Sequence, residues 1–297
     1  MDRILEYEIP SEYDGANITT VLKQHFKIST NLIKDLKKYK EGIQVNGEHR
    51  RVVDFVAKGD ILKITIRDTA SENIVPTDIP LDIVYEDEDV LVINKQPNMP
   101  THPSMGNYEN SLANGVMYYY KSKGEERVFR AVNRLDKDTS GLMAVAKNSY
   151  IHARLGEEIQ KKELKRKYMC IVCGDVEHDG TVDAPIRRAD GSVINRIVAP
   201  DGQRAVTHYR VIKRYREYTL LEMELETGRT HQIRVHMAYI GHPLVGDWLY
   251  GTEDHNIAKR QMLHSCYLCF THPITGQIME FKDEMAEDMR AFIEKLS

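Results

Sequence analysis

Short apolar runs that are typical of β-strands constrain the fold of this chain more than any other feature of its sequence. They recur from residue 81 onward, outnumber the helical segments and do not alternate regularly with them. Strand character is found in LDIVYEDEDVLVINK (81–95), RKYMCIVCGDV (166–176) and YTLLEMELETG (218–228), and helical character in SYIHARLGEEIQKK (149–162) and RTHQIRVHMAYIG (229–241). A doubly wound parallel sheet requires regular alternation, so the pattern favours an α+β fold instead.

The first 67 residues contain the pattern of a small separate unit over 15–67. Two short amphipathic helices are predicted at 17–26 and 29–41, the second with Ser29 or Thr30 as its N-cap. The Asn-Gly pair in GIQVNGEHRR indicates a tight hairpin, and DILKITIR adds an alternating strand. We expect four lysines on the second helix, beside the hairpin, where they would grip phosphates: Lys34, Lys37, Lys38 and Lys40.

A polar segment with two prolines, residues 68–80, separates this unit from the rest and has the composition of a linker. The sequence therefore predicts a first domain over 1–70, a linker over 71–80 and a second domain over 81–297.

The net charge of −4 conceals two basic stretches. Residues 20–51 carry eight Lys or Arg against three acids, and residues 186–216 carry eight against two. A chain of this kind can present a positive face to a phosphate backbone, although solvated surface charge is the simpler interpretation of either stretch alone.

Other bulk features limit where the chain works. It has no run of about 18 apolar residues, so no membrane span is expected. Its first residues lack the basic-then-apolar plan of a secretory signal, and its four cysteines do not indicate a disulfide framework. We therefore expect a cytoplasmic location.

The four cysteines form two Cys-x-x-Cys pairs, Cys170 with Cys173 and Cys266 with Cys269. Such pairs can build a zinc site, but both lie in strand-like sequence, where residues i and i+3 point to opposite faces. We favour ordinary strand thiols over zinc, and we expect no metal site.

Two polar stretches could carry chemistry. In VNRLDKDTSGL (132–142) a carboxylate, Asp136, follows an arginine at a turn between apolar segments, and the plain alternative is that Asp136 caps the turn. Ser140 does not sit in a G-x-S-x-G elbow. In TGRTHQIRVHM (227–237), a helix with Thr230 as expected N-cap carries Arg229 and Arg234, and an exposed basic helix start is the alternative.

Four segments in order, NRLDKDTSGL, RKYMCIVCG, ETGRTHQIRVHMAYIGHPLVGDWLYG and LHSCYLCFTHPITG, closely resemble the motifs of RluA-type RNA pseudouridine synthases. The resemblance runs from about residue 80 to the C-terminus, and residues 15–67 resemble the alpha-L RNA-binding motif. It implies the pseudouridine synthase fold, with a mixed, largely antiparallel sheet and flanking helices. One position departs from the family, which usually has His where this chain has Asn133.

The resemblance also implies a function: isomerisation of uridine to pseudouridine in ribosomal RNA, most readily of the large subunit, or in transfer RNA, by a monomer without cofactor or metal. It places Asp136 at the catalytic position, Arg234 as its partner and Tyr168 under the flipped uracil. Arg134 and Arg229 become candidates for flanking phosphates, and Lys34, Lys37 and Lys38 for more distant ones. The alternatives are an inactive RNA-binding module and a metal-dependent nuclease.

Overall fold

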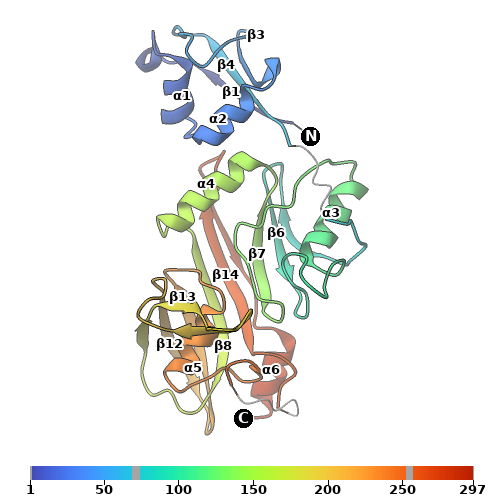
Figure 1. Cartoon of the computed structure of the whole chain (residues 1–297), viewed down its shortest axis with the longest axis vertical. Helices are drawn as coiled ribbons and strands as arrows, with labels where there is room; N and C mark the ends of the chain where they lie inside the picture. Colours follow the sequence, from blue (N-terminus) through green and yellow to red (C-terminus); the bar gives the residue numbers. More distant parts are fainter. Residues whose placement is uncertain (1, 69–73, 252–256, 297) are drawn as a thin grey trace.

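The computed structural model describes residues 2–68, 74–251 and 257–296. Its N-terminal part, at the top of Figure 1, is a four-stranded sheet in the order β1-β4-β2-β3 with two short helices on it. The bounds are β1 Arg3–Glu8, α1 Ile18–Gln24, α2 Thr30–Leu36, β2 Ile43–Val45, β3 Glu48–His49 and β4 Ile61–Ile66. The expected helices and hairpin are present, and Ser29 caps α2 by accepting a hydrogen bond from the backbone N–H of Leu32. Strand β1, which pairs along all of β4, was not predicted.

Helix α2 is shorter than the sequence pattern suggested, because it ends at Leu36. Only Lys34 therefore lies on the helix, while Lys37 and Lys38 follow it and Lys40 begins a single 3-10 turn. The chain turns back here to enter β2, and Gly42 passes so close to the Leu36 carbonyl that a Cβ would lie 2.0 Å from its oxygen. That close approach leaves no room for a longer helix.

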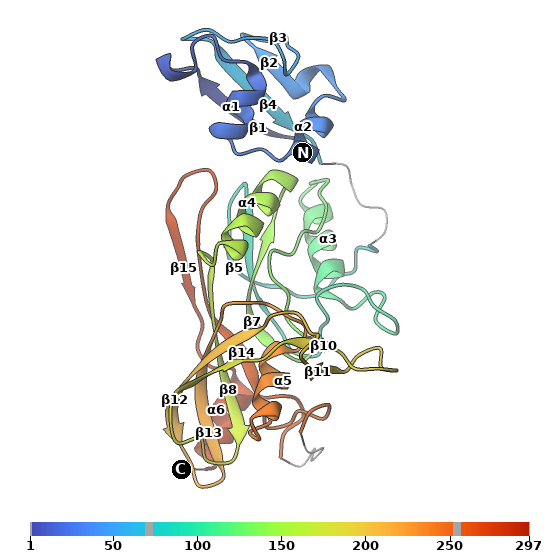
Figure 2. The same cartoon turned by 60° about the vertical axis from the view of Figure 1, so that its left-hand side comes forward.

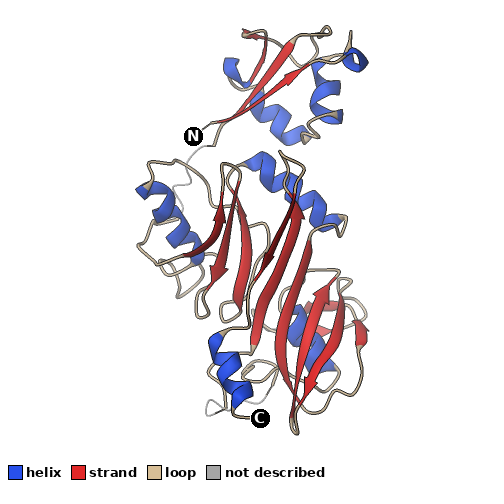
Figure 3. Ribbon diagram, turned by 180° about the vertical axis from the view of Figure 1, so that it is seen from behind, coloured by secondary structure: helices blue, strands red, loops and turns tan. Residues whose placement is uncertain are grey.

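The rest of the described chain is built on one long sheet, drawn in red through the centre of Figure 3. The strand order is β5-β6-β7-β14-β8-β13-β12-β9, with β15 paired to β14. Every pair is antiparallel except β7 with β14, so the predicted α+β class with a largely antiparallel sheet is confirmed. The bounds are β5 Asp82–Glu86, β6 Val90–Lys95, β7 Ser140–Ala146, β8 Lys165–Cys173, β9 Gly180–Asp183, β12 Val206–Arg214, β13 Tyr218–Leu225, β14 Leu263–Thr271 and β15 Ile278–Lys282.

Alternating side chains on β7 belong to two hydrophobic cores. Leu142, Ala144 and Ala146 pack toward α4 (Ser149–Gln160), while Met143 and Val145 pack toward α3 (Leu112–Ser122). Strand β7 is buried at every position, which explains its continuous apolar sequence. Two more helices, α5 (Gln232–Tyr239) and α6 (Glu287–Glu294), lie at the other end of the sheet, and the hairpin of β10 (Ile186–Arg188) and β11 (Arg196–Val198) projects beside α5 (Figures 1 and 2).

The N-terminal part sits directly on the larger part, above α4 (Figure 1). The Tyr150 hydroxyl on α4 donates a hydrogen bond to the Phe26 carbonyl at 2.9 Å, and Arg3 forms a two-bond ion pair with Asp89. Residues of both parts belong to one buried hydrophobic cluster. The described end of the expected linker is also packed, because the Asn114 side chain donates to the Val75 carbonyl at 2.7 Å.

Candidate active site

Asp136 lies in the turn that leads into β7. The turn is closed by the backbone, with the Thr139 N–H donating to the Asp136 carbonyl at 3.1 Å, so the Asp136 side chain is not needed as a cap. The chain before the turn is not the regular strand that its apolar sequence suggested. It is an irregular segment that pairs with β7 through hydrogen bonds such as Val132 N–H to the Ala144 carbonyl. The Asp136 carboxylate therefore lies just before the first residue of a fully buried strand, β7.

Two buried basic side chains, Lys95 and Arg260, hold this turn in place through hydrogen bonds. The Lys95 ammonium, 1% exposed, donates to the carbonyls of Gln96, Met99 and Lys137 at 2.8, 2.8 and 3.0 Å. Burial lowers the pKa of Lys95 to about 7. The Arg260 guanidinium donates to the Asp138 carbonyl at 3.0 Å and to the Ser140 hydroxyl at 3.2 Å. Neither contact can be foreseen from the sequence, because Lys95 is 42 positions from Lys137 and Arg260 is 122 positions from Asp138.

Arg234, on α5, reaches the Asp136 carboxylate with Nη1 at 3.1 Å from Oδ2. Its other nitrogens bind Asp247, with Nε 2.7 Å from Oδ2 and Nη2 2.8 Å from Oδ1. Burial lowers the pKa of Arg234, but the hydrogen bonds and charge of Asp247, with the charge of Asp136, outweigh burial and raise it. Arg234 is thus a cation held in a fixed position by two hydrogen bonds to the fully buried carboxylate of Asp247.

His231 and Tyr250 complete this side of the site. His231 precedes α5 in the left-handed conformation, φ 58°, and no side chain caps the helix, so the expectation that Thr230 is the N-cap was wrong. The His231 ring nitrogen Nδ1 lies 2.8 Å from the Tyr250 hydroxyl, and Nε2 lies 3.9 Å from Asp136 Oδ2. Strain of this kind in a residue other than glycine is typical of functional sites. Burial lowers the pKa of His231, so the ring is neutral at pH 7.

The start of α5 is also not the exposed basic surface that was the alternative interpretation, since Arg234 and His236 are both buried.

Tyr168 faces the same region from β8. Its side chain is 4% exposed, and its hydroxyl has no hydrogen-bond partner in the part of the chain that the structure describes. Burial raises the pKa of Tyr168, the charge of Arg166 lowers it and the charge of Asp136 raises it again. The phenol is therefore protonated at neutral pH. The structure thus places Arg234 in contact with Asp136, and Tyr168 close enough to Asp136 for the charge of this carboxylate to raise its pKa.

The deciding comparison is with protein families. Residues 89–239 match the family described as RNA pseudouridylate synthase. The chain belongs to the RNA pseudouridylate synthase family. It is an isomerase that converts uridine in RNA to pseudouridine.

Individual relatives agree with this family. The synthase is 45% identical to the RNA pseudouridine synthase YjbO of Bacillus subtilis over 90% of this chain and 94% of that protein. It is 40% identical to ribosomal large subunit pseudouridine synthase D of Pasteurella multocida, over 86% and 83% of the two chains. The solved structure of human RNA pseudouridylate synthase domain containing 1 covers 74% of this chain and 96% of its own, with a TM-score of 0.57 at 22% identity, which confirms the fold.

Asn133, which stands where the resemblance predicts a histidine, has a structural role here. Its Oδ1 accepts a hydrogen bond from the Ala144 N–H at 3.0 Å, which ties the segment before the Asp136 turn to β7. Its Nδ2 is buried with no hydrogen-bond partner among the described atoms. The side chain does not contact Asp136 through any hydrogen bond, so the substitution changes the support of the turn and not the carboxylate itself.

The predicted phosphate-binding residues occupy two separate regions. Arg134 is exposed beside the Asp136 turn, and Arg229 is exposed just before α5, where its Nε donates to the Arg204 carbonyl at 3.0 Å. Lys34, Lys37 and Lys38 are exposed in the N-terminal part, beyond α4 from α5 in Figures 1 and 2. Lys38 is paired with Asp35 at 2.6 Å, which leaves Lys34 and Lys37 as the two of these three without an ion pair among the described residues.

The four cysteines lie within β8 and β14, as the strand interpretation expected, and all four are free thiols. Burial raises the pKa of Cys266 to about 11, so this thiol is protonated at neutral pH. Within residues 2–68, 74–251 and 257–296, no three His, Cys, Asp or Glu residues are grouped so that they could hold a metal ion. No helix in the same ranges is long and apolar enough to cross a membrane.

Asp247, Lys95 and Arg260 were not identified as site residues from the sequence. For Asp247 a signal was available, because it stands in the quoted segment GHPLVGDWLYG. Lys95 and Arg260 act through backbone carbonyls, which leave no pattern in side-chain identity. Their contribution is to the position of the Asp136 turn.

Proposed function

We propose that Asp136 is the catalytic nucleophile of the synthase, with Arg234 as its fixed cation and Tyr168 as the surface on which the flipped uracil stacks. The observation that carries the proposal is the Asp136 carboxylate itself, 24% exposed at the end of a buried strand and 3.1 Å from an arginine that is anchored from behind. A partly exposed carboxylate can contact a substrate while Arg234, held by Asp247, stays in place.

The reaction has a simple chemical balance. The target nucleotide leaves the RNA stack and enters the site, because its atoms cannot be reached inside a helix. Asp136 adds to the sugar or to the base, the bond between C1′ and N1 breaks, and the freed uracil rotates above Tyr168. A bond between C1′ and C5 then forms, the carboxylate is released, C5 loses one proton and N1 takes up one, so the product is an isomer of the substrate. No electrons leave the substrate, so no redox carrier is consumed.

The test is the isosteric change Asp136→Asn. We expect it to abolish pseudouridine formation while RNA affinity stays within about tenfold, because the amide keeps its shape but cannot be the nucleophile. Asp138→Asn is the matched control, since Asp138 lies in the same turn and forms no hydrogen bond or ion pair with Arg234 in the described part of the chain. Turnover by Asp136→Asn near the parent rate would contradict the assignment.

We propose large-subunit ribosomal RNA as the substrate, supported by relatives at 40% and 44% identity that are named ribosomal large subunit pseudouridine synthase D. Pseudouridine mapping in a strain that lacks the gene tests this directly. Loss of sites in large-subunit RNA supports the proposal, whereas loss only in transfer RNA favours the second substrate considered from the sequence.

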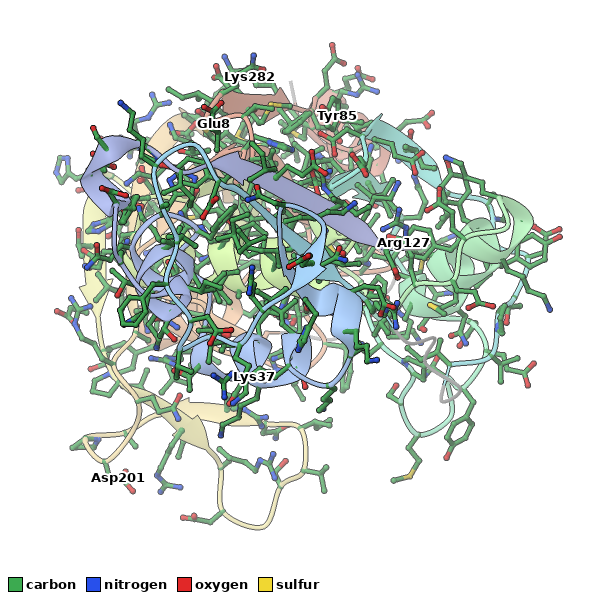
Figure 4. All side chains as sticks on the ribbon, turned by 90° about the horizontal axis from the view of Figure 1, so that it is seen from above. Glu8, Lys37, Tyr85, Arg127, Asp201 and Lys282 are labelled. Carbon is green, nitrogen blue, oxygen red and sulfur yellow. The ribbon has the colours of Figure 1, made fainter. Side chains whose placement is uncertain are left out.

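We further propose that the synthase acts as a cytoplasmic monomer and that residues 1–70 form an alpha-L type RNA-binding domain, with 71–80 as its connection to the catalytic domain of 81–297. Figure 4, viewed from above, supports a shared RNA face, because Lys37 and the loop around Asp201 project toward the same side of the molecule. Four of the eight cations of residues 186–216 are paired with acids, namely Arg187, Arg204, Arg210 and Arg214. Both basic stretches therefore keep cations without an ion pair in the described structure, and both can contribute to the proposed attraction.

A further inference from the structure

Arg166 is a buried cation without a partner. It lies on β8, two residues before Tyr168, and is 8% exposed. In the described parts of the chain it makes no hydrogen bond and no ion pair, and its Nε is fully enclosed without an acceptor. Its neighbours on the strand differ, because Lys167 lies 3.2 Å from Glu222 and Lys165 lies 3.9 Å from Glu224. The strand thus pairs its exposed cations and leaves the buried one unpaired.

The guanidinium lies at the entrance to α5. A Cβ added to Gly228 would be 3.4 Å from Arg166 Nη1 and 3.7 Å from Nη2, so the group lies against the loop that carries Arg229 and leads to Arg234. It also acts on the site electrostatically, since its charge is felt by Tyr168. Residues two apart on one face of a strand are about 7 Å apart, a separation that the base and the phosphate of one nucleotide can bridge.

A largely buried guanidinium without an anion is unfavourable, because it has lost part of its water, at Nε all of it, and has gained no charge partner. A ligand that brings an anion into the site removes that penalty. The planar fork of arginine matches a phosphate group, which accepts two parallel N–H bonds. RNA supplies a phosphate on each side of the uridine that stacks on Tyr168.

We propose that Arg166 binds an RNA backbone phosphate next to the flipped uridine and so fixes that nucleotide over Tyr168. This rests on the proposed role of Tyr168. Arg166 differs from Arg134 and Arg229, which are exposed, because it is largely buried and lies two residues from Tyr168 on the same strand.

The first measurement compares Arg166→Gln and Arg166→Lys with the parent on a transcript that carries a mapped target uridine. We expect KM to rise about ten- to a hundredfold for Gln with a smaller change in kcat, and Lys to recover part of the loss. The slope of log affinity against log salt should fall by about 0.7 to 0.9, the value for one phosphate contact. The free energy of unfolding in urea should be unchanged or higher, because an unpaired buried charge has been removed.

Arg290→Gln is the matched control, since Arg290 is exposed, lies outside both basic stretches and is paired with Glu284 at 2.6 Å. It should leave KM and the salt slope at parent values. A fall in stability of Arg166→Gln with an unchanged salt slope would overturn the proposal and make Arg166 a structural residue. An unchanged slope with full stability and raised KM would also overturn it, because it would indicate a contact with uncharged uracil.

A second measurement removes the negative charge from the RNA phosphate instead of the positive charge from Arg166. A synthetic RNA carries a single methylphosphonate on the 5′ or the 3′ side of the target uridine, with 2′-O-methyl ribose at the adjoining nucleotide. At one of the two positions the parent should lose affinity, and Arg166→Gln should lose no more. Additive losses at both positions would contradict the proposal. If the parent forms no pseudouridine in any RNA, the proposed function has failed; if the parent is active and the losses are additive, only the role of Arg166 has failed.

Discussion

At the scale of single residues, the arrangement around Asp136 separates the proposed nucleophile from the groups that hold it. The carboxylate is partly open, whereas Arg234 and Asp247 behind it are buried and joined by two hydrogen bonds. Breaking a buried pair of this kind leaves an uncompensated charge and is strongly destabilising. The structure therefore holds the reactive group on a support that the reaction does not have to rearrange.

Tyr168 allows two roles to be told apart by substitution. If the ring only stacks on uracil, Tyr168→Phe should cost little and Tyr168→Leu about 1–3 kcal/mol of base binding. If the hydroxyl takes part in removing the C5 proton, Phe should slow a late step about 10²–10⁴-fold. We expect the second result, since the hydroxyl has no hydrogen-bond partner in the described structure and can relay the C5 proton, accepting one proton as it releases its own.

The measurement for Tyr168 is single-turnover kinetics with separate assays of C5 proton release and of product dissociation. Full multiple-turnover activity of Tyr168→Phe would rule out proton transfer and leave stacking alone. Unchanged binding by Tyr168→Leu would remove the stacking role as well.

How far the site was predictable depends on the kind of contact. Asp136, Arg234 and Tyr168 stand in motifs that resemble those of a family, and the structure brings all three together. Arg260 could not be foreseen, because it acts on backbone atoms of a turn 122 positions away. Arg166 could not be distinguished from the neighbouring lysines, because only burial separates a paired surface cation from an enclosed one.

At the scale of elements, local patterns predicted the existence of helices and strands better than their ends. Helix α2 stops at Leu36 because Gly42 must pass its carbonyl, a contact between residues of different elements. The N-terminus of α5 carries a strained His231 where the pattern offered Thr230. The order of strands in the long sheet, which places β14 between β7 and β8, depends on pairing across more than 90 residues and leaves no local signal.

Glu86 on β5 links three elements and provides a test by pH. Its carboxylate lies 2.7 Å from Lys147 after β7, 2.6 Å from the Tyr119 hydroxyl on α3 and 2.9 Å from Lys123. Burial raises the pKa of Glu86, but these three hydrogen bonds outweigh burial and lower it to about 2. A lowered carboxyl pKa stabilises the fold above its ordinary value of 4.5, and this contribution is lost as the pH falls through 2.

We expect Glu86→Gln to lower the free energy of unfolding by about 2–3 kcal/mol between pH 5 and 7. The difference from the parent should shrink as the pH falls from 4.5 toward 2, as measured by urea unfolding at each pH. Glu280→Gln is the control, because Glu280 is exposed and pairs with Lys282 at the surface. A difference in the free energy of unfolding that stays constant across this pH range would show that the charge of Glu86 does not stabilise its contacts with Lys147, Tyr119 and Lys123.

At the scale of the whole molecule, the N-terminal part is held on the catalytic part by buried contacts. Phe26 and Tyr150 belong to one hydrophobic cluster, and Arg3 binds Asp89 across the same junction. Removing residues 1–70 would therefore expose apolar surface on α4 as well as remove lysines, and any loss of RNA binding would have two causes. Charge changes on the intact chain separate them.

The double variant Lys34→Gln/Lys37→Gln isolates the charge. Both side chains are exposed and have no ion pair in the described structure, so the free energy of unfolding should stay at the parent value. If each lysine displaces a counterion from RNA, the slope of log affinity against log salt should fall by about 1.4 to 1.8. The value of kcat should not change, because α2 lies beyond α4 from α5, the helix that carries Arg234. Lys38→Gln/Lys63→Gln removes the same charge from lysines already paired with Asp35 and Glu6, and should lower the slope less. Equal slopes for the parent and both variants would mean that RNA is bound by the catalytic part alone, with the N-terminal part serving only to cover the apolar face of α4.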